Sequence, residues 1–353
     1  MTSKERTSAV FSGKSFDRLP MWYGGDIQTT RNIIDCLGAS SEDKAMDILG
    51  IDFKTIRPRY IGPDLQKYKD GYVDTFWGIK RGGYHYGQAL THPLAHADSV
   101  EEIENYNWPK IEWWDVGFTC EDVENCKDYY TIGGMWAPFF HDALEFVGLE
   151  KFLVDMHLNP ELAEALVEII FEYYYALTEK AFQLNKGLID MLFIGNDFGT
   201  QRSLMFSPDM WRKFFKPRIK RFVELGHKYN LKTALHSCGD IHEIIPDLID
   251  IGLDAVNPIQ VNADNMDPVV LKREYGDHIV FFGGIDENVI LSYGTEKDVR
   301  DETRRMIDIL GCDGKYIVAA SHDYLLPEVP AINIVAMFDE AKIYSGNKYK
   351  LKS

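Results

Sequence analysis

Two residues that bind transition metals stand two positions apart in the segment LHSCGD, residues 235–240: His236 and Cys238. An imidazole nitrogen and a thiolate sulfur are ligands of zinc, and a catalytic zinc ion takes three protein ligands and keeps a fourth position open. Residues two apart on a strand point to the same face, so both side chains can turn toward one ion. The pair alone fits ordinary packing on a buried strand equally well, because buried cysteines are mostly packing residues.

A third ligand is expected at the end of another strand. In the segment VAASHD, Val318, Ala320 and His322 would share one face, and the small residues before His322 would leave room for its ring to lean toward the same ion. The third ligand is left open between His322 and a carboxylate. The predicted metal ligands are His236, Cys238 and His322, and the predicted metal is zinc.

Polar side chains follow the other apolar runs of the sequence as well. Carboxylates can act as general bases or orient a substrate, and the catalytic candidates are Asp197, Asp286 and Glu287. Capping of the following helix is the alternative role for Asp197 and Asp286. The substrate-binding candidates are aromatic, charged and amide side chains: Trp22, Asp26, Arg57, Trp136, Asn196, Gln201, Asn257 and Gln260.

These residues need a scaffold that brings the ends of many strands together. Short apolar runs alternate with helical patterns, which predicts strands over residues 18–25, 51–58, 129–138, 189–197, 231–239, 253–260, 278–286 and 315–322. Eight strands alternating with helices, without a change to linker composition, favour an α/β fold of one (β/α)8 TIM barrel over a doubly wound sheet. Active sites of such barrels lie at the C-terminal ends of the strands, where the candidate residues stand.

The predicted domain comprises residues 1–353, with an insertion of about residues 60–128 between the second and third strands. This connection is far longer than an ordinary one between a strand and a helix. Two interpretations stay open for it: a hairpin or lid over the mouth of the barrel, or a surface loop without a role in the site.

Composition limits the partners that the chain can have. The formal net charge of −17 disfavours nucleic acid, whose phosphates must be neutralised by clustered Lys and Arg, and it disfavours an anionic membrane surface. No uncharged apolar run approaches the ~18 to 20 residues that span a bilayer, and the N-terminal residues lack an apolar core of secretory length. Five scattered cysteines suit a reducing compartment. We therefore expect a cytoplasmic protein.

Longer segments carry a resemblance that covers nearly the whole chain. They are FIGNDFGTQRSLMFSPDMWRKFFKPRIKRFVELGHKYNLKTALHSCGDIHEIIPDLIDIGLDAVNPIQ, FFGGIDEN, GKYIVAASHDYLLPEVPAINIVAMF and, over residues 92–109, HPLAHADSVEEIENYNWP. The chain resembles the uroporphyrinogen decarboxylase superfamily, and within it the branch of corrinoid-dependent methyltransferases. The resemblance implies the same (β/α)8 barrel.

The resemblance also has two departures. True uroporphyrinogen decarboxylases carry an arginine-rich RQAGR segment after the first strand, where this chain reads MWYGGDIQTT and so lacks counter-charges for a tetrapyrrole's carboxylates. The related coenzyme M methyltransferases hold zinc with a histidine, a cysteine two residues later and a second cysteine at the end of strand eight. His236 and Cys238 match the first two, whereas His322 is nearest to the third, which makes coenzyme M a less expected acceptor.

The resemblance therefore implies a zinc-dependent methyltransferase that moves a methyl group between a methylated small molecule and the corrinoid (cobalamin) of a partner protein. A methoxylated aromatic compound is the favoured donor, because Trp22 and Trp136 would give the barrel an aromatic mouth. A homodimer is one possible assembly. The alternatives are a uroporphyrinogen decarboxylase-like lyase, with Arg57, Arg59 and Arg202 as basic residues near strand ends, and a non-catalytic homologue that binds a corrinoid or tetrapyrrole.

Overall fold

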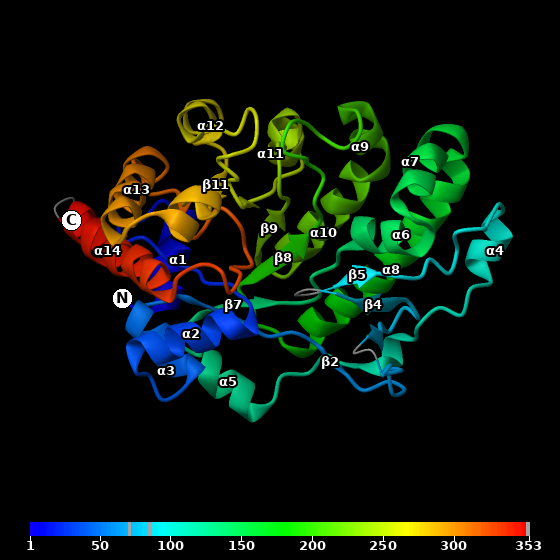
Figure 1. Cartoon of the computed structure of the whole chain (residues 1–353), viewed down its shortest axis with the longest axis horizontal. Helices are drawn as coiled ribbons and strands as arrows, with labels where there is room; N and C mark the ends of the chain where they lie inside the picture. Colours follow the sequence, from blue (N-terminus) through cyan, green and yellow to red (C-terminus); the bar gives the residue numbers. More distant parts are fainter. Residues whose placement is uncertain (70–71, 84–86, 351–353) are drawn as a thin grey trace.

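A parallel sheet of seven strands in the order β1-β7-β8-β9-β10-β11-β12 forms the centre of the protein (Figure 1). The computed structural model describes residues 1–69, 72–83 and 87–350. Neighbouring strands of the sheet pair in parallel. Its strands are β1 (Phe53–Thr55), β7 (Tyr130–Gly133), β8 (Met191–Gly195), β9 (Lys232–His236), β10 (Ala255–Asn257), β11 (Val280–Phe282) and β12 (Tyr316–Ile317). Helices connect consecutive strands, as parallel pairing requires.

The predicted first strand, residues 18–25, is present as isolated bridges between the two edges of this sheet. Met21 pairs in parallel with Val318, which follows β12, and its carbonyl accepts a hydrogen bond of 2.8 Å from the backbone N–H of Asp52, which precedes β1. Pro20 has no N–H to donate, which limits the length of a ladder at this point. The segment at Met21 therefore connects β12 to β1, and the α/β class of the fold is confirmed.

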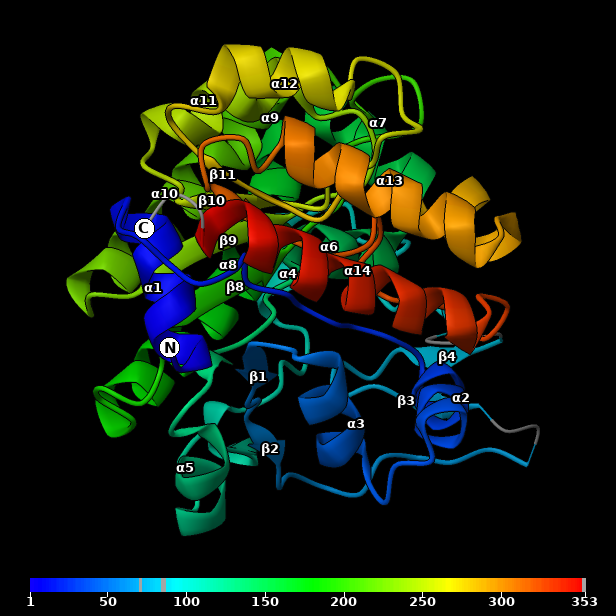
Figure 2. The same cartoon turned by 90° about the vertical axis from the view of Figure 1, so that its left-hand side faces the viewer.

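Helices surround the sheet in both views. In Figure 1, α9, α11 and α12 lie on one side of the strands and α2, α3 and α5 on the opposite side, and in Figure 2, α13 and α14 face the viewer. No helix in the described part of the chain is long and apolar enough to cross a membrane. The helices outside the segment between β1 and β7 are α1 (Ser3–Ser12), α2 (Ile27–Leu37), α3 (Glu42–Leu49), α6 (Phe139–Val147), α7 (Leu149–Leu158), α8 (Pro160–Leu184), α9 (Pro208–Phe214), α10 (Lys216–Lys228), η2 (His242–Ile244), α11 (Ile245–Asp250), α12 (Pro268–Tyr275), the π-helix η3 (Glu287–Leu291), α13 (Glu296–Ile309) and α14 (Ala331–Lys350).

Alternate residues of the strands pack on opposite faces of the sheet. Phe193 and Phe282 belong to the hydrophobic cluster enclosed by the strands, with their rings stacked 5.6 Å apart, whereas their neighbours Ile194 and Phe281 pack against the outer helices. This alternation is the pattern of a sheet that curls around its own side chains. The inward face also leads from Ala234 to His236, the last residue of β9.

The expected alternation at the last strand is wrong by one residue. Ile317 and Ala319 lie in the inner cluster, whereas Val318 and Ala320 belong to the outer one. The strand β12 is only two residues long, so too few alternating positions exist in the sequence to fix which face is buried inside. The reasoning that led to an inward-leaning His322 therefore does not hold, although His322 still lies at the same end of the sheet.

The long segment between β1 and β7 contains two small antiparallel sheets and short helices. Trp77, which precedes β4, is 3% exposed and packs against Tyr173 and Tyr174 of α8, so this segment is anchored to the helices around the sheet. In Figure 1, β4, β5 and α4 lie beside α6 and α8. The elements of the segment are β2 (Arg59–Tyr60), β3 (Val73–Asp74), β4 (Lys80–Gly82), β5 (Gln88–Ala89), α4 (Val100–Glu104), η1 (Ile111–Trp113), β6 (Trp114–Asp115) and α5 (Cys120–Cys126).

Candidate active site

Three potential metal ligands meet at the C-terminal end of β8 and β9. Atoms of Asp197, His236 and Cys238 all lie within 4.8 Å of one another. Nε2 of His236 is 3.1 Å from Oδ1 of Asp197 and 3.4 Å from Sγ of Cys238. We call these three residues the ligand cluster. Its nitrogen, oxygen and sulfur donors are the set that zinc accepts.

Glycines allow the loops that carry the ligand cluster to pack together. Gly239 has a φ of +84°, and a Cβ there would lie 2.4 Å from the carbonyl carbon of Gly199, so neither the backbone conformation nor the space admits a side chain. The close approach lets the backbone N–H of Cys238 donate to Oδ1 of Asp197 at 2.8 Å. The loops after β8 and β9 are thereby fixed to each other at the ligand cluster.

The ring of His236 is oriented from the next strand. Nδ1 lies 2.9 Å from Oδ1 of Asn257, and the amide nitrogen of Asn257 donates to the carbonyl of Phe282. Because an amide oxygen only accepts, Nδ1 carries the proton and Nε2 is turned toward Asp197 and Cys238. The carboxylate of Asp323 also lies 3.3 Å from Nδ1.

Charges within the ligand cluster shift the pKa values of its members. Burial acts to lower the pKa of His236, but the nearby Asp323, Cys238 and Asp197 outweigh burial and raise it well above its ordinary value. Burial opposes ionisation of Asp197, yet hydrogen bonds from His141 and His236 hold its pKa well below the usual range. Burial raises the pKa of Cys238 to about 11. A divalent cation would displace the protons of the imidazole and the thiol, so the donor set fits zinc.

His322, the predicted third ligand, is not part of the ligand cluster. Its ring centre is 6.4 Å from that of His236, with the two rings nearly perpendicular, and its Nδ1 accepts a hydrogen bond from the backbone N–H of Tyr324 at 3.2 Å. In the structure Asp197, and not His322, is therefore the third member of the ligand cluster. A ligand role for His322 stays a prediction.

Two predicted substrate-binding amides hold loops together. Gln260 accepts a hydrogen bond of 2.6 Å from the backbone N–H of Gly239, which supports the loop of Cys238. Asn196 accepts from Phe140 and donates to the carbonyl of Ala137, which attaches the start of α6 to β8. Both side chains are buried and act on the backbone.

Three other predicted residues belong neither to the ligand cluster nor to the buried amides. The side chain of Gln201 is exposed, and only its backbone carbonyl makes a described hydrogen bond, from Asp264. Asp286 accepts from the backbone N–H of Val289 and so caps η3. Asp26 accepts from the N–H of Gln28 at the start of α2. The structure thus gives Asp286 the capping role that was its alternative, and it gives Asp26, a predicted substrate-binding residue, a cap of α2.

Glu287 is the third predicted catalytic carboxylate and it is buried. Burial raises its pKa to about 7, while the nearby His322 lowers it and Asp323 raises it. Its Oε2 has no hydrogen-bond partner among the residues that the structure describes. An enclosed carboxyl group of this kind holds a proton near neutral pH.

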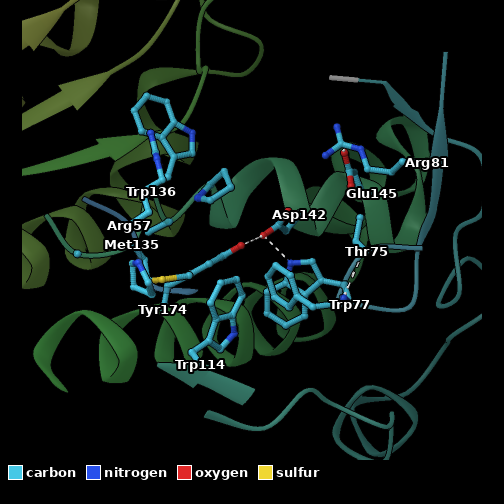
Figure 3. A pocket seen from close by; sticks show the side chains of 15 residues that line it. Arg57, Thr75, Trp77, Arg81, Trp114, Met135, Trp136, Asp142, Glu145 and Tyr174 are labelled. Carbon is cyan, nitrogen blue, oxygen red and sulfur yellow. Dashed lines mark hydrogen bonds and ion pairs between the residues drawn. The ribbon is translucent and has the colours of Figure 1, made fainter. Parts of the chain in front are cut away.

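A cavity of about 270 Å³ adjoins the ligand cluster (Figure 3). Trp136 separates the two: its ring lines the cavity and lies 5.3 Å from the ring of His236. Gly195 leaves the space for this indole, since a Cβ there would lie 1.8 Å from it. The guanidinium of Arg57 is 5.4 Å from the Trp136 ring. We call this space the aromatic cavity; its lining includes Arg57, Phe76, Trp77, Arg81, Trp114, Trp136, Asp142, Glu145 and Tyr174.

Trp22 is not part of this lining. Its ring meets the edges of Phe193 and Phe282, so it packs on top of the inner hydrophobic cluster. Of the predicted aromatic mouth, the structure therefore places Trp136 at the aromatic cavity and Trp22 on the inner core.

Sequence reasoning missed several residues of the site. Nε2 of His141 lies 3.3 Å from Asp197, and Asp142 lies beside it in the lining of the aromatic cavity. Both belong to α6, whereas the barrel pattern predicts functional residues at strand ends. Asp323, which contacts His236, directly follows His322, so its position next to a predicted ligand was the available signal.

Comparisons with known proteins identify relatives of this chain. The family model "Uroporphyrinogen decarboxylase (URO-D)" matches residues 85–344. The methylcobamide:CoM methyltransferase MtbA of Methanosarcina acetivorans is 20% identical over 279 residues, which cover 76% of this chain and 75% of the relative. The methylcobamide:CoM methyltransferase MtaA of Methanosarcina barkeri is 23% identical over 210 residues, or 60% and 57% of the two chains. A solved structure of a methyltransferase from Methanosarcina mazei superposes with a TM-score of 0.63 at 17% identity, over 98% of this chain and 99% of the other. This last similarity establishes the fold.

Proposed function

Since the chain belongs to the uroporphyrinogen decarboxylase family, we propose that it is a corrinoid-dependent methyltransferase. It moves a methyl group between a methylated small molecule and the corrinoid of a partner protein, and the favoured donor is a methoxylated aromatic compound. The family resemblance read from the sequence is confirmed, and the curated relatives are methylcobamide:CoM methyltransferases. The observation that carries the proposal is the ligand cluster, which lies beside an aromatic cavity at the C-terminal end of the strands.

Asp197, His236 and Cys238 would hold zinc, with Asn257 keeping the ring of His236 in place. When bound, zinc supplies a Lewis acid that polarises the heteroatom of the methyl donor, and the corrinoid supplies the cobalt that accepts the methyl group. The protein's own contribution is to position the donor beside these groups, to exclude water and to stabilise the charge that develops on the leaving oxygen.

Arg57 is the residue that suits the last of these tasks. Among the described residues its guanidinium makes no hydrogen bond or ion pair, and it lies over Trp136, on the side of the aromatic cavity. Its donors are therefore available to the oxygen of a bound methoxyarene, where a positive charge stabilises the departing aryloxide. Glu287, which holds a proton near neutral pH, stays a proposed catalytic acid that lies outside the lining of the aromatic cavity.

A tetrapyrrole decarboxylase is disfavoured by the size and charge of the aromatic cavity. A cavity of roughly 150 Å³ is enough to bind benzene, so about 270 Å³ takes one substituted ring and no tetrapyrrole. Arg59 is paired with Asp115 and Asp122 on the surface, and Arg202 is exposed in the loop after β8. Only Arg57 of the three predicted basic residues lines the cavity.

The finer architecture is part of the same proposal. Residues 1–353 form one (β/α)8 TIM-barrel domain, with Met21 in the place of the first strand, and the insertion of about residues 60–128 covers the aromatic cavity. Trp77 and Arg81 of the insertion line that cavity, which supports this interpretation over a surface loop without a role. A cytoplasmic location is also proposed, because five cysteines scattered along the sequence without a framework spacing suit a reducing compartment.

The test combines metal analysis with a transfer assay. The purified protein should contain about one zinc ion per chain, and it should convert cob(I)alamin to methylcobalamin, followed by visible absorbance, with at least one member of a panel of methoxylated aromatics and methylamines. A zinc-loaded protein that transfers no methyl group from any member of the panel would refute the proposed function.

A further inference from the structure

Asp142 presents one carboxyl oxygen to the aromatic cavity and uses the other within the protein. Tyr174 of α8 donates to Oδ2 at 2.5 Å, and Nε1 of Trp77 donates to the same oxygen at 2.9 Å (Figure 3). Within the described residues, no hydrogen bond reaches Oδ1. Oδ1 is not fully enclosed, although Asp142 as a whole is only 6% exposed. Because Asp142 lines the cavity, its remaining surface is the one that a ligand meets.

The other walls fix the shape of such a ligand. Trp114, Trp136 and Tyr174 present aromatic rings to a space of about 270 Å³, which suits a single flat ring with small substituents. The charged groups lie at the two ends: Arg57 beside Trp136, and Arg81 paired with Glu145 at 2.9 Å (Figure 3). A flat ligand ring bound between these two ends would have its edge toward Asp142.

The proton of Asp142, when present, points into the cavity. Burial raises the pKa of this carboxyl to about 7; the hydrogen bonds from Tyr174 and Trp77 and the charge of His141 act to lower it, and Glu145 acts to raise it. Since Tyr174 and Trp77 both donate to Oδ2, the proton of the neutral acid sits on Oδ1. Oδ1 is thus an acceptor when Asp142 is ionised and a donor when it is neutral.

A ring hydroxyl is the substituent that matches both states. A hydroxyl group donates to an ionised Oδ1 and accepts from a protonated one, whereas a methoxy group or a carbonyl can only accept. We propose that Asp142 is a specificity-determining residue of the methyl-donor pocket, and that it selects single-ring methoxyarenes that carry a ring hydroxyl, the methoxyphenols. This inference rests on the proposed function and narrows its substrate class.

Binding tests the inference without any methyl transfer. Titration calorimetry compares 2-methoxyphenol with 1,2-dimethoxybenzene, which replaces only the hydroxyl, at pH 6 and pH 8. A hydrogen bond to a charged group contributes about 1.5 kcal/mol or more. At pH 8, 2-methoxyphenol should therefore bind about tenfold more tightly than 1,2-dimethoxybenzene does. The affinity for 1,2-dimethoxybenzene should fall from pH 6 to pH 8, and that for 2-methoxyphenol should stay nearly constant.

The variant Asp142→Asn keeps an oxygen for Tyr174 and Trp77 but presents an amide that donates at both pH values. It should bind the two compounds within about twofold of each other and lose the pH dependence. Asp155→Asn, which changes a buried aspartate of α7 outside the cavity, should behave as the unaltered protein does. If Asp142→Asn does not fold, as judged by circular dichroism, the pH comparison of the unaltered protein still decides.

Equal affinity of the unaltered protein for both compounds at pH 8, or a hydroxyl preference that survives in Asp142→Asn, would overturn the inference. Methyl transfer that proceeds equally well from arenes without a hydroxyl overturns it too, while leaving the proposed function intact. A hydroxyl preference that depends on Asp142 in a protein without methyl transfer would instead refute the proposed function and leave the arene site in place.

Discussion

The amide oxygen of Asn257 lies 2.9 Å from Nδ1 of His236, so the last residue of β10 orients the last residue of β9. The two residues are direct partners in the register of these parallel strands. Asn257 is itself held by the carbonyl of Phe282 on β11. Three adjacent strands therefore fix the direction in which Nε2 points, before any ligand or metal is bound.

Asn257→Ala should weaken zinc binding by about 10-fold to 100-fold, the usual effect of losing a partner that orients a ligating histidine. The measurement is competition for zinc with a chromogenic chelator. Asn262→Ala is the matched control, because that amide donates to Asp286 outside the ligand cluster. Unchanged zinc affinity in Asn257→Ala would mean that Nδ1 of His236 needs no fixed partner.

Asp197 and His322 can be separated as third ligands by single substitutions. Asp197→Ala should lower zinc affinity by about 100-fold or more, as loss of a direct ligand does, because its Oδ1 lies 3.1 Å from Nε2 of His236. His322→Ala should change it by less than about tenfold. The measurement is zinc content after dialysis against a graded series of chelator concentrations, with His227→Ala on the surface as the control. The reverse order of the two effects would return His322 to the role predicted from the sequence.

Arg57→Leu should lower kcat for a methoxylated donor by about 10-fold to 100-fold, because a hydrogen bond to a charged donor contributes about 1.5–3 kcal/mol and this donor stabilises the departing aryloxide. Zinc content should not change, because Arg57 contacts the Trp136 face and not the ligand cluster. Steady-state kinetics with added cob(I)alamin is the measurement. Arg202→Leu, at an exposed position, should keep the kcat of the unaltered protein. Loss of zinc in Arg57→Leu would contradict the assigned role.

The sequence contained enough to locate the ligand cluster but not to choose its third member. His236 and Cys238 share a strand end, and the two-residue repeat of a strand dictates that they face the same way. Asp197 reaches them because the loops after β8 and β9 meet at Gly199 and Gly239, a contact between segments about forty residues apart. No local pattern predicts such a contact.

The aromatic cavity was beyond sequence reasoning for the same cause. Asp142, Trp77 and Tyr174 meet across separations of 65 and 32 residues, and they come from the insertion, α6 and α8. Each looks like an ordinary core or surface residue in its own segment. A buried carboxyl group becomes visible as a candidate only when its two donors and its open side are seen together.

Asp142→Asn should stabilise the protein at high pH. The folded pKa of about 7 lies above the ordinary value near 4, so the folded state holds a proton that the unfolded state releases, and stability falls as pH rises from about 4 to 7. Three pKa units correspond to about 4 kcal/mol of stability that the unaltered protein loses at high pH. The asparagine variant avoids this loss, but part of the gain is offset because its hydrogen bonds from Tyr174 and Trp77 are weaker. The Tm of the variant minus that of the unaltered protein, measured by calorimetry, should therefore increase from pH 5 to pH 8 and correspond to about 1–2 kcal/mol at pH 8. Asp155→Asn, whose carboxylate is paired with Lys151, should not reproduce this trend. A Tm difference that is constant over this range would show that Asp142 is ionised in the folded protein throughout.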